Sequence, residues 1–467
     1  MSDKLSRPGY REILRRAESF FEILILTLEF YLIWRHYYST RHFPHYGSMG
    51  KYVLMMVYAV LLIFVFYLCD SLKFGQLKFS DVFVSQVISI LMVNFITYFQ
   101  LCLISNRLIS IPPMLFLTLL DVVCCFGLSF LYSSLYHKLF SPRNMVMIYG
   151  NENAVSLKFK MDRRQDKYAV NTLLSIEEDG EYIKSVIDKH DAVIINDVPA
   201  EKRNDILKYC FGKNIRTYVV PKISDILTKG AHDITLFDTP LMLIKRGGLN
   251  PTQRLVKRIF DVILSLIAII VSSPVMLLIA IAIKAEDGGP VFYKQERVTI
   301  DERKFNIIKF RSMIVNAEAQ GLSIPAKGHD PRITKVGSVI RPLRLDELPQ
   351  IFNILVGNMS IVGPRPERTE HVEKYTAEIP EFTYRHKVKG GLTGYAQIFG
   401  KYNTTAYDKL RLDLMYIENY SLLLDIKLIV MTARILFKKE STEGFEVQED
   451  IENWKKQLKE KNNKSGE

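Results

Sequence analysis

Two adjacent carboxylates, Asp346 and Glu347, stand among arginines and glycine-rich turns in the last third of the chain. The pair precedes Leu348-Pro349 and an apolar run, which predicts the first turn of a helix, where the helix dipole favours an ionised carboxylate. An ionised aspartate beside a Mg²⁺-binding glutamate and arginines can attack a phosphorus atom and become an acyl phosphate, because the cations neutralise phosphate charge. An Asp-Glu pair at a helix start is more often only a cap, so the residue types alone leave both interpretations open.

Longer motifs surround the pair. They are Lys257-Arg-Ile-Phe-Asp261, Gly289-Pro-Val-Phe292, Lys309-Phe-Arg-Ser-Met313, Asp330-Pro-Arg-Ile-Thr334, Leu345-Asp-Glu-Leu-Pro-Gln350 and Gly363-Pro-Arg-Pro366. In this order they make residues 250–437 resemble the catalytic domain of the bacterial sugar transferases, the monotopic phosphoglycosyl transferases. Members of this family move a phosphosugar from a nucleotide diphosphate sugar to undecaprenyl phosphate. The part before residue 250 resembles, more weakly, the large subclass of the family.

The resemblance implies roles for the matching positions. Asp346 corresponds to the nucleophile and Glu347 to its Mg²⁺-binding partner, so Mg²⁺ is the expected cofactor. Arg365, in Pro364-Arg-Pro366, matches a contact to the substrate diphosphate or nucleotide, and Arg341 matches a basic residue close to the pair. The chain departs from the family pattern at Gly390, Tyr395 and Thr299, where proline, tryptophan and glycine are usual.

The reaction implied by the resemblance joins a UDP-sugar and undecaprenyl phosphate. It gives undecaprenyl-diphosphate-sugar and UMP through a covalent aspartyl phosphosugar, as the first membrane step of capsule, exopolysaccharide or O-antigen synthesis. The sequence does not reveal the sugar or the pathway. UDP-glucose or UDP-galactose is the donor that the large subclass implies.

A long apolar run at 259–283 is interrupted by Ser272-Ser273-Pro274 and flanked by Lys257-Arg258 and Lys284. Proline removes an amide donor, and serine hydroxyls can bond to the carbonyls that this frees. We therefore predict a helix that enters the membrane, turns at Ser273-Pro274 and leaves on the same face, as the family's re-entrant helix does. The alternative is a proline-kinked transmembrane helix.

Apolar stretches near the N-terminus are each close to the roughly 20 residues that a helix needs to cross a bilayer. They run over 18–34, 52–69, 83–104 and 112–136. The distribution of Lys and Arg around them places the N-terminus and everything after residue 140 inside the cell. We therefore expect a protein of the bacterial inner (cytoplasmic) membrane whose catalytic domain faces the cytoplasm.

Between these regions the pattern changes to that of a small α/β unit. Residues 145–149, 192–196 and 216–220 are typical of buried parallel strands, and 201–212 of a helix between them. The turn after the first strand has one glycine, Gly150, where a dinucleotide fingerprint needs three. A nucleotide-sugar dehydratase or oxidoreductase acting through this unit is the alternative function, and a non-catalytic scaffold is a third.

The composition agrees with a membrane-associated chain. The 467 residues carry a net charge of +12, and the basic residues cluster beside the apolar runs, so membrane lipids rather than nucleic acid are the expected partners. The sequence is compatible with a homo-oligomer and does not determine the oligomeric state. The expected fold is that of an α/β membrane protein: four transmembrane helices at 1–140, a Rossmann-like cytoplasmic domain at 141–247, a mixed α/β catalytic domain at 248–440 with the re-entrant helix at 259–283, and a charged C-terminal helix or tail at 441–467.

Overall fold

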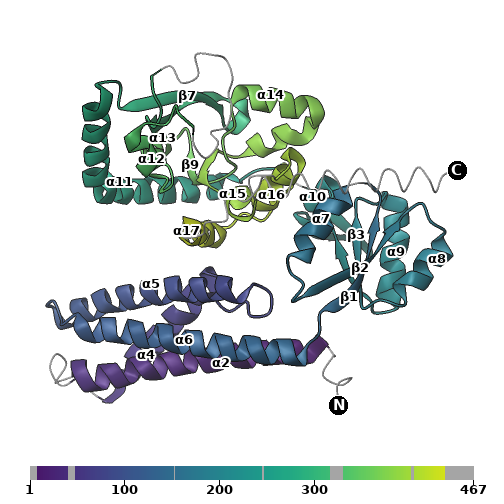
Figure 1. The fold of residues 1–467 in the computed structure, drawn as a ribbon, viewed down its shortest axis with the longest axis horizontal. Helices are drawn as coiled ribbons and strands as arrows, with labels where there is room; N and C mark the ends of the chain where they lie inside the picture. The colour runs from purple at the N-terminus through teal and green to yellow at the C-terminus, as the bar shows by residue number, and fades with distance from the viewer. Residues whose placement is uncertain are drawn as a thin grey trace. The chain divides into compact units, whose positions relative to one another are not determined.

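The computed structural model describes residues 8–39, 48–151, 153–244, 247–315, 330–400 and 404–436. The chain divides between Val220 and Pro221 into two compact units (Figure 1). The expected tail at 441–467 lies outside the described residues.

A bundle of helices begins the first unit, and Figure 1 shows these helices side by side. They are α2 (Pro8–Ile33), continued by a π-helical turn (Trp34–Tyr38), α4 (Ser48–Leu68), α5 (Phe79–Ser105) and α6 (Pro112–Leu139). Polar side chains lie inside the bundle, where Gln86 donates to Glu22 and Asn94 donates to Asp121. Many large apolar side chains on the same helices are exposed. An apolar exterior around a hydrogen-bonded polar interior is the arrangement that a bilayer favours.

Among the described residues, four helices are long and apolar enough to cross a membrane: Met49–Leu68, Phe79–Ser105, Pro112–Leu139 and Pro251–Asp287. Three of them belong to the expected N-terminal set. The first expected span forms part of α2, which is not among the four because charged residues, including Glu18, Glu22 and Glu29, interrupt its apolar sequence. Together with the mixed α/β content, these helices fit a membrane protein of the α/β class.

A four-stranded parallel sheet completes the first unit, with strand order β2-β1-β3-β4. Its elements are β1 (Arg143–Tyr149), α7 (Asn153–Asp162), β2 (Tyr168–Ser175), α8 (Gly180–Ile187), β3 (Ala192–Asn196), α9 (Ala200–Gly212) and β4 (Arg216–Val219). Alternate residues of β1 pack into two cores, with α8 and α9 on one face and α7 on the other. The three strands and the helix predicted from the sequence are confirmed as β1, β3, β4 and α9, whereas β2 was not predicted.

Gly150, at the end of β1, has a structural reason to be glycine. A Cβ atom at this position would lie 2.3 Å from the carbonyl oxygen of Asp197, which follows β3. The backbone that follows β3 therefore requires a glycine at position 150, whether or not a ligand binds. Gly150 provides no argument for a nucleotide site.

The second unit surrounds three two-stranded sheets with helices. The strand pairs are antiparallel β5 (His232–Leu236) with β6 (Thr239–Leu243), antiparallel β7 (Phe292–Val298) with β8 (Lys304–Phe310), and parallel β9 (Ser360–Val362) with β10 (Gly391–Thr393). The helices are α10 (Ile223–Lys229), α11 (Pro251–Asp287), α12 (Lys335–Ile340), α13 (Gln350–Val356), α14 (Thr369–Glu378), α15 (Tyr395–Phe399), α16 (Ala406–Glu418) and α17 (Leu422–Leu436). Short 3-10 segments are η2 (Ile300–Glu302), η3 (Leu345–Glu347) and η4 (Pro380–Lys387).

The long helix α11 bends along its length, and Figure 1 shows α12 and α13 in the angle between its two arms. Pro274 lies inside this helix and has no N–H to donate to the carbonyl of Ile270. The Ser273 hydroxyl donates to that carbonyl instead, at 3.0 Å, and the Ser272 hydroxyl donates to the carbonyl of Ala268 at 2.6 Å. The predicted compensation by serine is confirmed, although the helix bends here without ending.

The first turns of α11 are fixed to the rest of the second unit by buried polar contacts. Lys257 donates to Asp425 of α17 at 2.5 Å and to the hydroxyl of Tyr416 at 3.1 Å. Asp261 accepts from the Ser360 hydroxyl, at the start of β9, at 3.1 Å. This helix is therefore part of the folded unit and not a separate anchor.

Candidate active site

The carboxylate pair lies in a tight connection between α12 and α13. Thr334 caps α12 by accepting from the backbone N–H of Gly337 at 2.9 Å, and the Glu286 carboxylate of α11 accepts from the N–H of Lys335 at 2.7 Å. After α12, Arg344 adopts a left-handed conformation with a φ of 54°, which reverses the chain.

Asp346 and Glu347 then form the 3-10 segment η3, directly before α13. The expected first turn of a helix is therefore a separate 3-10 turn, because α13 begins only at Gln350. Pro349 takes the N-cap position of α13. The carboxylates therefore precede the helix, and its dipole is not their main electrostatic influence.

Glu347 is held by two cations from different parts of the unit. Its Oε1 atom lies 3.0 Å from Lys309 Nζ, on β8, and 3.0 Å from Arg365 Nη2, on the loop after β9. Burial opposes ionisation of this carboxyl, but the charges of Arg365 and Lys309 outweigh it and lower its pKa to about 2. Glu347 is therefore ionised throughout the physiological pH range.

Asp346 has the opposite electrostatics. Burial raises its pKa above the ordinary value, and the negative charge of Glu347 adds to the rise. Lys309 and Arg341 counteract part of this effect, which places both cations within electrostatic reach of the Asp346 carboxyl. An anion that is stabilised less than its neighbour is suited to attack an electrophile.

Lys309, in the motif Lys309-Phe-Arg-Ser-Met313, and Arg297 are site residues to which the sequence motifs assigned no role. Both line a small pocket that also contains Arg365. The remaining lining residues are Ile307, Gln350, Pro366 and Gly391. Burial and the charge of Arg365 lower the pKa of Arg297 to about 10, so this arginine still carries its charge at neutral pH. Three cations around one small pocket favour contact with an anion that carries several charges, such as a diphosphate.

The other predicted site residues fall into two groups. Arg341 ends α12, and the buried prolines Pro364 and Pro366 flank Arg365 in the loop after β9. Ser273 and Pro274 lie at the bend of α11 and do not line the pocket.

Two of the three departures from the family pattern contact each other. The Thr299 hydroxyl accepts from the backbone N–H of Gly390 at 3.0 Å and donates to the carbonyl of Asn358 at 3.0 Å. A proline at 390 would have no N–H, and a glycine at 299 would have no hydroxyl. The two departures are therefore joined by a hydrogen bond, and they lie beside the site, since a Cβ atom at position 390 would lie 3.0 Å from the Pro366 ring.

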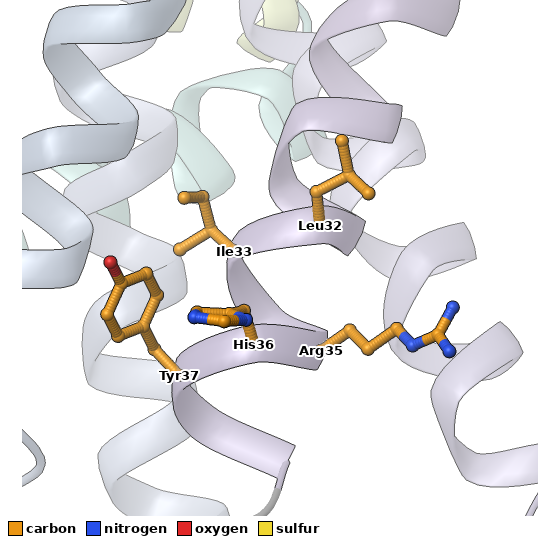
Figure 2. A pocket seen from close by; sticks show the side chains of 5 residues that line it. All are labelled: Leu32, Ile33, Arg35, His36 and Tyr37. Carbon is orange, nitrogen blue, oxygen red and sulfur yellow. The ribbon is translucent and has the colours of Figure 1, made fainter.

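A second pocket lies in the first unit, around the end of α2 (Figure 2). It is lined by Leu32, Ile33, Arg35, His36 and Tyr37. Figure 2 shows Arg35 extending to the opposite side of the helix from Tyr37, so these side chains do not converge on a common point. This pocket provides no arrangement of catalytic groups.

The residues present are compatible with a bound Mg²⁺ ion. No group of three or more His, Cys, Asp or Glu side chains suited to a metal occurs among the described residues. Mg²⁺ is commonly held by one or two carboxylates together with substrate phosphates and water, so it does not need such a group. Glu347, ionised and beside the cationic pocket, supplies one carboxylate of this kind.

Comparison with known proteins agrees with this arrangement. The family described as bacterial sugar transferase matches residues 252–439. A UDP-N-acetylgalactosamine-undecaprenyl-phosphate N-acetylgalactosaminephosphotransferase of Aeromonas hydrophila is 40% identical over 266 residues, which cover 54% of this chain and 62% of that protein. A UDP-glucose:undecaprenyl-phosphate glucose-1-phosphate transferase of Klebsiella pneumoniae is 42% identical over 208 residues, covering 44% of this chain and 43% of that protein.

A UDP-glucose:undecaprenyl-phosphate glucose-1-phosphate transferase of Caulobacter vibrioides is 36% identical over 201 residues, which cover 42% of this chain and 75% of that protein. For several of the relatives, including the one from Klebsiella pneumoniae, the match spans only about half of their length. The family match contains Asp346, Glu347, Lys309 and Arg365. The chain belongs to the bacterial sugar transferases.

Proposed function

We propose that the protein transfers a sugar-1-phosphate from a UDP-sugar to undecaprenyl phosphate, giving undecaprenyl-diphosphate-sugar and UMP. The observation that carries this proposal is the contact of Glu347, the neighbour of Asp346, with Lys309 and Arg365, each at 3.0 Å. The relatives, which include N-acetylgalactosamine and glucose phosphotransferases, support the same class of reaction.

The transfer proceeds in two displacements at one phosphorus atom. A carboxylate oxygen of Asp346 attacks the phosphorus that bears the sugar, the bond from that phosphorus to the UMP oxygen breaks, and UMP leaves. A phosphate oxygen of undecaprenyl phosphate then attacks the same phosphorus. The bond to Asp346 breaks, and the carboxylate is regenerated.

The cations of the pocket bind the donor and balance its charge. Arg365, Lys309 and Arg297 present guanidinium and ammonium groups to the diphosphate, where they stabilise the negative charge that develops on the leaving UMP. Glu347 would hold Mg²⁺ together with the donor diphosphate. When bound, the ion supplies further charge neutralisation on the phosphate oxygens.

The second unit meets the membrane through α11, which we propose enters and leaves the bilayer on the same face. Exposed apolar side chains on α12 and α13, which both contact this helix, support this placement: Val339 of α12 and Val356 of α13 are 61% and 75% exposed. Leu343 is 59% exposed, and the neighbouring Arg344 is exposed as well. Apolar and cationic side chains beside an apolar helix are typical of a lipid headgroup boundary.

We place the protein in the bacterial inner membrane with the second unit in the cytoplasm, at the first membrane step of capsule, exopolysaccharide or O-antigen synthesis. A same-face helix leaves Asp346 on the side where nucleotide sugars are made. The basic residues before the first helix support a cytoplasmic N-terminus.

The test is UMP release by the purified full chain with undecaprenyl phosphate, Mg²⁺ and one UDP-sugar at a time. The names of the relatives make UDP-glucose and UDP-N-acetylgalactosamine the first donors to compare, followed by UDP-galactose. We expect one donor to give acceptor-dependent UMP release that Asp346→Asn abolishes. Release of UDP in place of UMP would show a glycosyl transfer and contradict the proposal.

A further inference from the structure

The loop that carries Arg365 is held by a hydrogen bond at each of four consecutive carbonyl groups. The acceptors and their donors are Pro364 O from Gly391 N at 2.8 Å, Arg365 O from Arg385 Nη2 at 3.0 Å, Pro366 O from Arg297 Nη1 at 3.3 Å, and Glu367 O from Val298 N at 3.1 Å. Two of the donors are arginine side chains, and Arg297 also lines the cationic pocket. Arg385 does not line the pocket, so its contact with the loop needs a separate explanation.

Arg385 is a buried cation that contacts an acidic and an aromatic side chain. Its side chain is 2% exposed, and that of its partner Asp413, on α16, is 1% exposed. Arg385 Nε and Nη2 lie 3.0 and 2.7 Å from the same Asp413 oxygen, Oδ2. The ring of Phe382 lies 4.8 Å from the guanidinium carbon. Removing an ion pair from water is expensive, so a purely apolar side chain could fill this position at lower cost.

The planar guanidinium can bond to two partners at once, and here it connects Asp413 to the carbonyl of Arg365. Arg365 in turn reaches Glu347 at 3.0 Å, one residue from the proposed nucleophile. Direct contacts therefore connect Asp413, on α16, through Arg385 and Arg365 to the carboxylate pair.

We propose that Arg385, oriented by Asp413, is a positioning residue that fixes the backbone of Arg365 and thereby aims its guanidinium at the donor diphosphate. This inference rests on the proposed function, because it assigns Arg385 to the first displacement. Arg385 touches neither donor nor acceptor and acts only through Arg365.

The test uses Arg385→Lys in the full chain. Lysine keeps the charge beside Asp413, but its single ammonium cannot reproduce the planar two-sided contact. The measurement is the exchange of labelled UMP into UDP-sugar without acceptor, which reports the first displacement alone. We expect the kcat/KM of exchange to fall about tenfold, because small misplacements of a charge-binding group reduce rates by that order. The kcat/KM for undecaprenyl phosphate in the full reaction, which reports the second displacement, should stay unchanged.

A double-mutant cycle with Arg365→Ala separates positioning from a general structural role. The carbonyl at 365 remains in Arg365→Ala, so Arg385→Lys should lower the melting temperature equally in both backgrounds. Its effect on exchange should shrink to less than about twofold in the Arg365→Ala background, since the guanidinium to be aimed is gone. Arg411→Lys, on the same helix as Asp413 and paired with Asp408, is the matched control and should leave exchange unchanged.

Two results would overturn the inference. One is an additive loss, in which Arg385→Lys lowers the kcat/KM of exchange a further tenfold in the Arg365→Ala background. The other is an equal effect of Arg385→Lys on the kcat/KM values for donor and acceptor, which would show a general disturbance of the unit. Absence of exchange in the wild-type chain would instead contradict the proposed function itself, so the two failures are distinguishable.

Discussion

Asp346 and Glu347 are adjacent, yet their surroundings push their pKa values in opposite directions. Burial and the charge of Glu347 raise the pKa of Asp346, whereas Arg365 and Lys309 overcome burial at Glu347 and lower its pKa to about 2. A pair of carboxyls with diverging pKa values commonly divides the chemical work between its members. In the proposed mechanism the less stabilised anion is the nucleophile, and the fully ionised one binds cations.

The stability of the folded chain should respond oppositely to the loss of each charge. A raised pKa means that the folded chain binds the proton more tightly than the unfolded chain, so ionised Asp346 destabilises the fold at neutral pH. Asp346→Asn should therefore raise the melting temperature by about 2 °C. The same variant should abolish exchange, because the proposed nucleophile is gone. Glu347→Gln, which loses both ion pairs, should lower the melting temperature. Melting temperatures of the substrate-free chain in detergent provide the measurement, and a less stable Asp346→Asn variant would contradict the assignment.

The pH dependence of exchange should follow the protonation of Asp346. Since its pKa lies above the ordinary 3.8, activity should be complete only above this raised pKa and fall as the pH drops through it. Glu347, with a pKa of about 2, stays ionised in this range. The charge of Lys309 lowers the pKa of Asp346, so Lys309→Met should shift the acid limb of the kcat/KM profile to higher pH. A shift to lower pH would show that another group controls the limb.

At the scale of the elements, short irregular connections hold the site. The pair lies between α12 and α13, Lys309 on β8, and Arg365 on a loop that β7 and β10 both contact. Thr299, directly after β7, adds a bridge through the N–H of Gly390 to the segment before β10. Few of these contacts are between neighbours in the sequence, so the site depends on the packing of the whole unit.

Thr299 should contribute to stability through its hydroxyl. In Thr299→Val the buried N–H of Gly390 loses its acceptor, which should cost about 1–3 kcal/mol of unfolding free energy. Thr299→Ser keeps the hydroxyl and is the matched control. Thermal or denaturant unfolding of the two variants tests this, and equal stability of the valine and serine variants would show that the bridge is unimportant.

The elements also show what a sequence can predict. Apolar and β-branched runs identified β1, β3, β4 and the long helix α11, and the serines before Pro274 bond to the carbonyls as predicted. The strand β2 was missed because polar residues such as Asn171 interrupt it. The roles of Lys309 and Arg297 were missed because they depend on the pairing of β7 with β8 and on the side to which each side chain points. Such information is not local in the sequence.

At the scale of the whole molecule, the number of membrane crossings decides on which side the site lies. The helices α4, α5, α6 and α11 are apolar and long enough to span, whereas α2 carries four glutamates along its length. The proposed function needs both ends of α11 in the cytoplasm. This requirement concerns topology, and the fold of each unit does not depend on it.

Single cysteines test the topology of α11. In a background without the five native cysteines, Thr252→Cys and Ala285→Cys place exposed thiols near the two ends of the helix. A membrane-impermeant maleimide should label both in inverted vesicles and neither in intact spheroplasts. Labelling of Ala285→Cys in spheroplasts would show that α11 crosses the membrane and would place Asp346 outside.

The covalent intermediate on Asp346 is the central claim, and UMP exchange in the absence of undecaprenyl phosphate tests it most directly. If Asp346 carries the phosphosugar, labelled UMP must enter the UDP-sugar pool without any acceptor, since the first displacement is reversible. We predict this exchange for the wild-type chain, its loss in Asp346→Asn, and a mass increase of one sugar-phosphate on the peptide containing Asp346. Robust overall turnover without exchange, or near-normal turnover by Asp346→Asn, would contradict the account.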